Sequence, residues 1–307
     1  MTARRPALVV LPATLLFAGC LTNTGEGWIV GSLRVESCRD GEALDRPGTF
    51  DLGADFFAGD PLFDSDPASG QKRNSLALRI QQTSNRVEEA DGLALHFHDL
   101  AQVARAFAAE VPLPVSADYA CPQGRCVPSQ RTIEAQLSLF NTCPGNRHAL
   151  AGSSRELLAD PPPAGAPAAA RPATCLRPSG QEIAACPTLS AADQQALRAV
   201  CASPFDRQED RHTIARILGQ GDTRSDQRVA AHACVFVCEL GQVRVGQSPA
   251  SLAEFQLEFG EHLAALLSLS LVDSRSLALG LCAQSGGQLQ GKFRIKLVRS
   301  RAAQAFP

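Results

Sequence analysis

Two histidines separated by one residue are the first place in the chain where the residue types suggest chemistry. His96 and His98 lie in an alternating run, so on a strand both imidazoles project from the face opposite Leu95 and Phe97, with Asp99 next along. Two imidazoles at this spacing can bind zinc or copper, but a metal centre needs at least one more ligand, which the sequence does not identify. A solvated strand face is the ordinary alternative, so we predict no metal site and no cofactor.

A second cluster combines sulfur with a histidine. In a cytosolic enzyme, His232, Cys234 and Cys238 would suggest a zinc site or a reactive thiolate. On a strand, Cys234, Phe236 and Cys238 share one face, and each cysteine is free to form a bridge elsewhere. Because the cysteine count and the export signal described below favour disulfides, we predict no catalytic cysteine.

The remaining motifs do not identify an enzyme. The sequence contains no Gly-x-Ser-x-Gly elbow, no phosphate-binding Gly-x-x-x-x-Gly-Lys, no dinucleotide fingerprint and no His-Glu-x-x-His. We therefore expect a structural or binding component rather than a catalyst. The alternative is an exported hydrolase or a metal-binding protein that uses His96 and His98, with Asp99 as a further catalytic suspect.

A group of carboxylates offers the oxygen ligands that calcium prefers, but its spacing does not match the EF-hand loop. A solvated acidic loop is the simpler interpretation. The carboxylates are Asp51, Asp55, Asp60, Asp64 and Asp66.

The amino terminus has the features of an export signal, which we place at residues 1–19. Arg4 and Arg5 give it a charged start, and residues 7–17 form an apolar stretch too short to span a bilayer. The segment Leu16-Phe17-Ala18-Gly19-Cys20 resembles the lipobox of bacterial lipoproteins, with Phe17 where leucine is usual.

This resemblance implies that the Cys20 thiol carries a diacylglycerol and that cleavage frees an amino group, which receives a further acyl chain such as palmitate. The membrane is then a partner through the lipid anchor. Leu21 stands where inner-membrane retention often uses aspartate, so we expect an outer-membrane anchor in the cell envelope, with the protein facing the periplasm or the surface. A plain cleaved signal peptide and an amino-terminal membrane helix are the alternatives.

The charge balance excludes one class of partner. Without Arg4 and Arg5 the chain has 27 basic and 31 acidic residues. Because phosphate binding needs a concentrated basic surface, we expect no nucleic-acid partner. An envelope protein or a glycan remains as the class of partner to consider.

The cysteine count predicts disulfides. Eleven cysteines minus Cys20 leave an even number in a compartment that oxidises thiols. Cys38 and Cys282 are alone in the two flanks, so their spacing predicts a bridge between them, while the middle eight close among themselves. Cys121–Cys126 and Cys186–Cys201 are the local candidates. The other candidates are Cys143, Cys175, Cys234 and Cys238.

The flanks alternate apolar and polar residues, which predicts short, half-buried strands joined by tight turns. Phe293, Ile295 and Leu297 should face inward, and the basic stripe of Lys292, Arg294 and Lys296 should face water. This pattern favours a mainly β fold, an antiparallel sandwich with a disulfide-rich, partly helical insertion. The expected strand regions are residues 28–36, 50–56, 76–80, 93–97, 254–259, 277–281 and 293–297, with a turn at 285–288.

The middle of the chain differs in composition. Residues 159–173 form a loop rich in proline and alanine, Ser190 is a plausible N-cap for a helix through Val200, and Asp99 could cap another. We predict a tether at 20–27, the sandwich at 28–118 and 246–307, and the cysteine-rich insertion at 119–245. Two sequential domains divided at the proline stretch are the alternative.

Overall fold

The computed structural model describes residues 24–39, 42–65, 70, 72–82, 90–116, 133–143, 148–151, 186–219, 233–273 and 285–298. The predicted signal peptide at residues 1–19 and Cys20 lie outside these residues. The strands are β1 (Thr24–Arg39), β2 (Glu42–Asp51), β3 (Phe56–Ser65), β4 (Lys72–Gln81), β5 (Asp91–Phe97), β6 (Leu113–Ser116), β7 (Ile133–Leu139), β8 (His148–Ala151), β9 (Cys234–Leu240), β10 (His262–Asp273) and β11 (Ser285–Lys296). The helices are α1 (Leu100–Ala108), α3 (Ala191–Ala202) and α4 (Arg211–Leu218), with short 3-10 helices η3 (Gln208–Asp210) and η4 (Pro249–Leu252).

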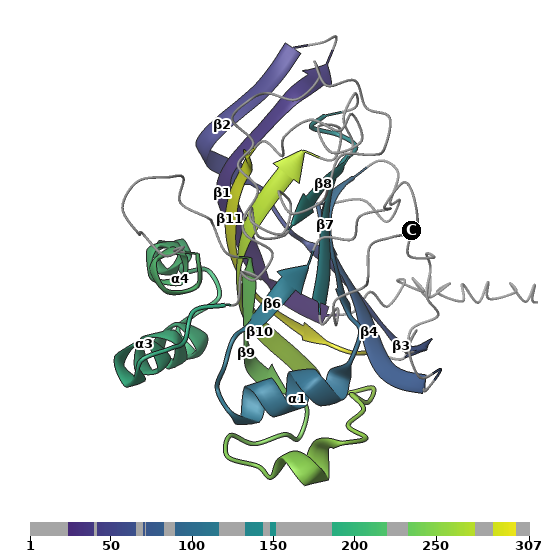
Figure 1. Ribbon diagram of the computed structural model, residues 1–307. Coiled ribbons are helices and arrows are strands. Elements are labelled where there is room, and N and C mark those ends of the chain that lie inside the picture. The colour runs from purple at the N-terminus through teal and green to yellow at the C-terminus, as the bar shows by residue number, and fades with distance from the viewer. Residues whose placement is uncertain are drawn as a thin grey trace, which may run out of the picture.

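All the described strands belong to one 11-stranded sheet (Figure 1). The strand order is β2-β1-β11-β10-β9-β6-β7-β5-β4-β3, and β8 pairs with both β10 and β7. Within the described part of the chain, β6 and β7 form the only parallel pair, and the other pairings are antiparallel. The protein is therefore mainly β, as the alternating pattern predicts.

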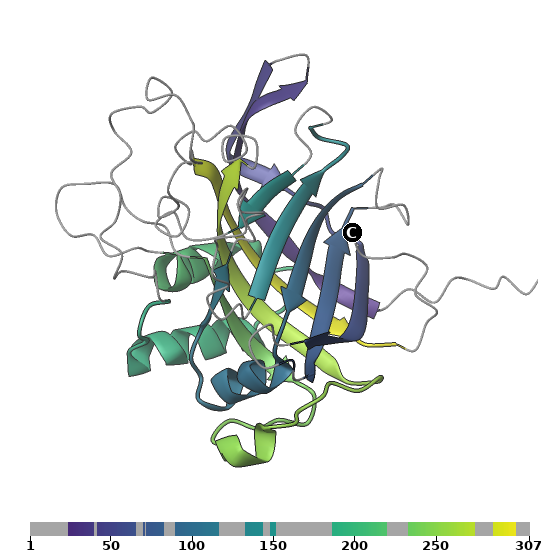
Figure 2. The same ribbon diagram turned by 45° about the vertical axis from the view of Figure 1, so that its right-hand side comes forward.

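The sheet is open but strongly curved, so that β3 at one edge approaches β1 and β11 near the other (Figure 2). A Cβ atom added to Gly25 would lie only 2.3 Å from the Phe57 ring, and one added to Gly59 would lie 2.5 Å from the Leu297 side chain. These close approaches leave no room for side chains at the two glycines. The concave face encloses one apolar core to which both halves of the sheet contribute, as the two layers of a sandwich do.

The predicted strand regions 28–36, 76–80, 93–97 and 293–297 are confirmed, with shifted ends. The region 50–56 is not a strand, because residues 52–55 connect the end of β2 at Asp51 to the start of β3 at Phe56. Leu76, Leu78 and Ile80 of β4 and Leu93 and Leu95 of β5 are buried on the concave face. In contrast, residues 253–261 form turns rather than a strand, and β10 begins only at His262. The expected turn at 285–288 is instead the start of β11, because these residues pair with β1 and β10. The alternating run at 277–281 lies outside the described residues.

The segment 119–245 is part of the sheet as well as the source of two helices. The described residues of this segment supply β7, β8 and β9, and β9 lies between β10 and β6 near the middle of the strand order. At the other boundary, β1 already begins at Thr24, inside the expected tether, and pairs there with Lys296.

Two helices begin at the capping residues that the sequence predicts. Asp99 accepts a hydrogen bond from the Gln102 amide at the start of α1, and Ser190 accepts one from the Asp193 amide at the start of α3. Helix α1 contacts β9, β4 and η4 at one end of the curved sheet (Figure 1). None of the helices in the described residues has the length and apolarity to span a bilayer.

Helices α3 and α4 cover the convex face of β1, β11, β10 and β9 (Figure 2). A second apolar cluster forms between these two layers. Its members from the sheet include Trp28, Phe236 and Leu266, and those from the helices include Leu197 and Ile214. The convex face of this half of the sheet is therefore buried under helices, unlike a face exposed to water.

The disulfide pairing differs from the prediction. Cys38 pairs with Cys143, and not with Cys282, because the end of β1 lies beside the turn that follows β7. Cys186 and Cys201 do not pair with each other: Cys186 joins Cys234, and Cys201 joins Cys238. Both of these bridges connect the helical layer to β9. Cys121, Cys126, Cys175 and Cys282 lie outside the described residues.

The burial of Lys292 contradicts the prediction that the basic stripe of Lys292, Arg294 and Lys296 faces water. Arg294 is half-buried and Lys296 is exposed, but Lys292 is only 1% exposed because α3 covers it. Its ammonium donates hydrogen bonds to the Val200 and Ser203 carbonyl oxygens, both at 2.6 Å, and to the Ser203 hydroxyl. Burial lowers the pKa of this ammonium. The charge lies at the carboxyl end of α3, where the helix dipole favours a cation.

We expect the Lys292→Ala substitution to lower the free energy of unfolding by about 2–4 kcal/mol, because the carbonyl groups at the end of α3 lose their donor and a cavity forms. Lys296→Ala, on the same face of β11 but exposed, is the matched control and should change it by less than about 0.5 kcal/mol. Lys292→Met keeps most of the packing and separates the two causes. Equal, small effects at both positions in urea denaturation would contradict the role of Lys292.

Candidate functional site

The convex face of the other half of the sheet carries polar groups. Alternation along β5 places His96 on this face, because Leu95 and Phe97 point into the core, and His98, directly after the strand, continues the alternation. In the strand register, His96 lies beside Ala77 of β4 on one side and Glu134 of β7 on the other. The predicted pair of imidazoles on one face is therefore present.

Asp64 of β3 reaches the two histidines across β4. Its Oδ2 atom lies 3.1 Å from His96 Nε2 and 2.7 Å from His98 Nδ1. The centroids of the two imidazole rings are 4.0 Å apart. Glu134 Oε2 lies 3.3 Å from His98 Nε2, on the other side of that ring. Two carboxylates and two imidazoles thus form one half-buried group, which we call the histidine cluster (Asp64, His96, His98 and Glu134).

The two imidazoles have pKa values displaced in opposite directions. Burial lowers the pKa of His96, and the neighbouring His98 lowers it further. Burial also acts to lower the pKa of His98, but the carboxylates of Glu134 and Asp64 outweigh that effect and raise it. The cluster therefore favours one protonated ring, at His98, over two.

The histidine cluster includes residues that sequence reasoning missed. Asp99 was suspected because it follows His98, but its carboxylate caps α1 and lies 3.6 Å from Arg73 Nη1. Asp64 takes part instead. Its only sequence signal was membership in the acidic group, which does not form one calcium loop: Asp51 ends β2, Asp60 and Asp64 lie on β3, and Asp66 is outside the described residues.

Cys234 and Cys238 form disulfides and are therefore not available as metal ligands or as reactive thiolates. Cys234 and Cys238 share one face of β9, as predicted, and each is bonded to a cysteine of the helical layer. His232 lies outside the described residues.

A cleft of about 670 Å³ lies on the convex side of the sheet between α1, α3 and β9. Its volume is within the range of small-molecule sites in proteins. Three aromatic rings line it, those of Phe107, Phe205 and Phe236, together with Ala202, Ala264 and Val245. Val245 is 54% exposed, so an apolar surface faces solvent here.

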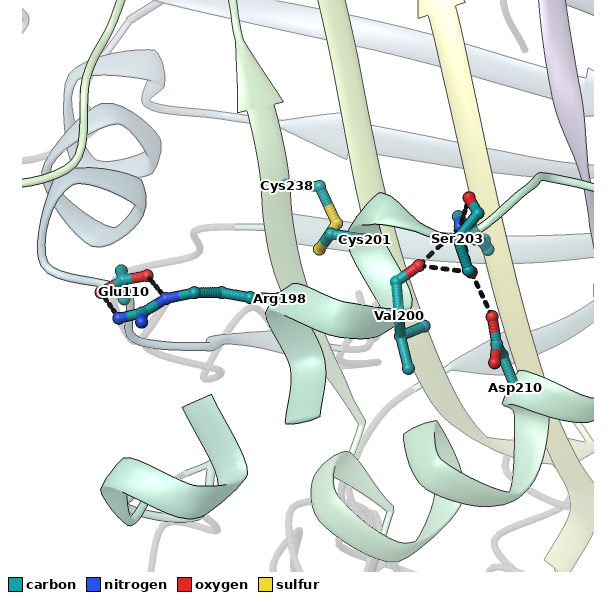
Figure 3. The surroundings of a disulfide bond; sticks show 8 residues. Glu110, Arg198, Val200, Cys201, Ser203, Asp210 and Cys238 are labelled. Atoms are coloured by element: carbon teal, nitrogen blue, oxygen red, sulfur yellow. Dashed lines mark hydrogen bonds and ion pairs between the residues drawn. A yellow bond between two sulfur atoms is a disulfide. The ribbon is translucent and has the colours of Figure 1, made fainter. Parts of the chain in front are cut away.

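Covalent and ionic contacts hold the walls of the cleft (Figure 3). The disulfide between Cys201 of α3 and Cys238 of β9 is part of its lining. Arg198 of α3 forms a two-bond ion pair with Glu110, which follows α1, and so joins the two helices across the cleft. On the sheet side, Glu239 Oε2 lies 3.0 Å from Arg294 Nε. The charged groups at the cleft are therefore paired with each other.

Glu110 has a backbone conformation that favours glycine. Its φ is 52°, the left-handed region, and it is the only residue other than glycine with positive φ in the described part of the chain. At the end of a helix this position is usually glycine, which has no Cβ penalty there. The side chain of Glu110 faces the cleft and binds Arg198. A glutamate is therefore present at a position where the backbone favours glycine, and its contact with Arg198 is made at the cost of backbone strain.

Three disulfides among the described residues indicate an oxidising, extracytoplasmic compartment. Comparison of the chain with protein-family models, with curated proteins and with solved structures found no match.

We expect Glu110→Gly to be more stable than Glu110→Ala by about 1 kcal/mol, because both lose the carboxylate but only glycine relieves the left-handed backbone. Ala109, with φ of −90°, is the matched control: Ala109→Gly should be destabilising by about 0.5–1 kcal/mol. Thermal or urea unfolding measures both differences. A glycine at position 110 that is no better than alanine would contradict strain at this position.

Proposed function

We propose that this protein is a lipid-anchored binding component of the cell envelope, and that it holds an uncharged, apolar ligand in the cleft between α1, α3 and β9. The observation that carries this proposal is the cleft of about 670 Å³ with three aromatic rings in its walls. Aromatic and aliphatic walls with a few polar groups are typical of small-molecule sites.

The charges at the cleft support an uncharged ligand. Arg198 is neutralised by Glu110, and Arg294 by Glu239, so neither arginine presents an unpaired charge to a bound molecule. A ligand carrying a net charge would have to displace one of these pairs. A ligand with an apolar body would instead contact Phe107, Phe205 and Phe236 and remove exposed apolar surface from water.

The walls are suited to binding without rearrangement. The Cys201–Cys238 disulfide connects α3 to β9 at the cleft, and Lys292 joins the end of α3 to β11. A site whose walls are already in place spends little binding free energy on ordering them. The hydrolase alternative has less support, because the residues that line the cleft do not include His96 or His98.

The lipid anchor rests on the resemblance of Leu16-Phe17-Ala18-Gly19-Cys20 to the lipobox. The disulfides agree with export, since they form in oxidising compartments. With Cys20 acylated and β1 beginning at Thr24, only a few residues separate the membrane surface from the sheet. Leu21 favours delivery to the outer membrane under the same resemblance.

The anchor predicts a defined mass. Protein purified from its native membrane should have the mass of a chain that begins at Cys20 plus that of its acyl groups, measured by intact mass spectrometry. Cys20→Ser should abolish the acyl mass, whereas Leu21→Asp, a neighbouring control, should retain it. A mature chain that begins elsewhere, or one without acyl groups, would contradict the lipid anchor.

The cleft predicts binding of a neutral fluorescent probe such as N-phenyl-1-naphthylamine. Ala202→Trp, which fills the cleft from the exposed end of α3, should weaken probe binding at least ~10-fold, a loss of about 1.4 kcal/mol. Ala199→Trp is the matched control, because Ala199 is exposed on the same helix but does not line the cleft. Both variants are titrated in the same detergent as the wild type, so the micelle background cancels. Equal probe binding by all three would contradict a ligand site in the cleft.

A further inference from the structure

We propose that Asp64, His96 and His98 bind a divalent transition-metal ion, and that Zn²⁺ is the ion this ligand set fits best. The proposal is independent of the cleft, since none of these residues lines it. Within the described residues, these form the only group of three or more histidine, cysteine or acidic side chains whose ligand atoms lie close enough to share an ion, all within 4.8 Å of one another.

The three donor atoms converge on one region. His96 Nε2 and His98 Nδ1 both approach the same carboxylate oxygen, at 3.1 and 2.7 Å. Ligand atoms at the corners of a zinc tetrahedron are about 3.3 Å apart, given metal–ligand bonds of about 2.0–2.1 Å. The observed spacings therefore need only small side-chain rotations to surround an ion.

His96 has a nitrogen in need of a partner. Its Nε2 atom is buried and has no hydrogen-bond partner of acceptable geometry among the described residues. Asp64 Oδ2, the acceptor closest to it in position, already forms the 2.7 Å hydrogen bond with His98 Nδ1. A metal ion would satisfy both nitrogens and the carboxylate oxygen together, which one proton cannot do.

The backbone holds these ligands in place. β5 pairs with β4 on one side and with β7 on the other, so the backbone of His96, next to the last residue of β5, is paired on both sides, and His98 follows directly after the strand. The β3–β4 register runs without interruption from Phe56↔Gln81 to Ser65↔Lys72 and includes Asp64. Ligands on paired strands lose little freedom when an ion binds.

Glu134 is not one of the proposed ligands, but its carboxylate lies beside the His98 ring. When His98 binds a metal through Nδ1, its proton resides on Nε2, a buried atom that has no hydrogen bond of acceptable geometry among the described residues but lies 3.3 Å from Glu134 Oε2. A carboxylate at this position orients the ring and increases its basicity, as it does beside many metal-bound histidines. The carboxylates of Asp64 and Glu134 together also balance the charge of a divalent ion.

The ligand types and exposure select the ion. Imidazole nitrogens suit zinc, copper and nickel, whereas Ca²⁺ and Mg²⁺ prefer sets made of oxygen atoms. The side chains of Asp64, His96 and His98 are 28%, 31% and 20% exposed, so solvent can reach the ion. Three protein ligands and an accessible fourth position form a site of the kind that keeps a water molecule on zinc.

The test is calorimetric titration of Zn²⁺ into the full-length protein, purified without a histidine tag and freed of metal by a chelator that is then removed. We expect one equivalent to bind at micromolar zinc, with no displacement by excess Ca²⁺. His96→Ala and His98→Ala should each weaken binding at least ~10-fold, and Glu134→Gln about 10-fold while retaining the stoichiometry.

His262→Ala is the matched control, because His262 is a half-buried strand histidine near a carboxylate, Glu239, but lies outside the histidine cluster. It should bind zinc as the wild type does. Thermal melting of each variant without metal shows whether it is folded, and Co²⁺ in place of Zn²⁺ gives visible absorption that reports coordination directly. No binding of zinc to the wild type at micromolar concentration, or binding by the His96→Ala and His98→Ala variants as tight as that of the wild type, would overturn the proposal.

Discussion

A curved sheet can enclose an apolar core only on its concave face, and this constraint determines the surroundings of every strand residue. On the concave side, alternate residues from both halves form one apolar core, in which Leu267 and Phe293 have no exposed surface. The residues between them point outward and need a different environment. Helices α3 and α4 supply it over β9, β10 and β11, while the β3, β4, β5 and β7 half carries polar side chains. The cleft and the histidine cluster therefore both lie on the convex face.

The helical layer depends on more than apolar contact. Helices of 12 and 8 residues bury little surface alone, and helices this short are marginal without tertiary contacts. Two disulfides connect this layer to β9, and Lys292 donates from β11 to the end of α3. Each of these links opposes separation of the helices from the sheet. Cys201 attaches α3 to β9 through its disulfide and also lines the cleft. The same bond therefore stabilises the helical layer and fixes the position of one wall of the cleft.

Local features of this fold could be predicted from the sequence, but features that depend on distant segments could not. Alternation identified β4 and β5, and capping residues identified the starts of α1 and α3, because each signal lies within a few residues. The partner of Cys38 depends on where the far end of β1 meets the turn after β7, which spacing along the chain does not report. Lys292 was expected in water because nothing near it in sequence shows that α3 covers it. Asp64 was missed in the same way, since it reaches His96 only across β4.

The composition of the histidine cluster is not explained by the requirements of the sheet. The concave side chains of β5 already bury their apolar surface, so the convex positions contribute little to the core. β-branched residues such as threonine would suit a half-buried strand surface as well or better. Instead, two imidazoles and two carboxylates are partly removed from water, which carries a desolvation cost that only mutual pairing offsets. Both imidazole rings are directed at one oxygen of Asp64, which cannot satisfy both nitrogens. A divalent cation between the rings and the carboxylate would bind all three atoms.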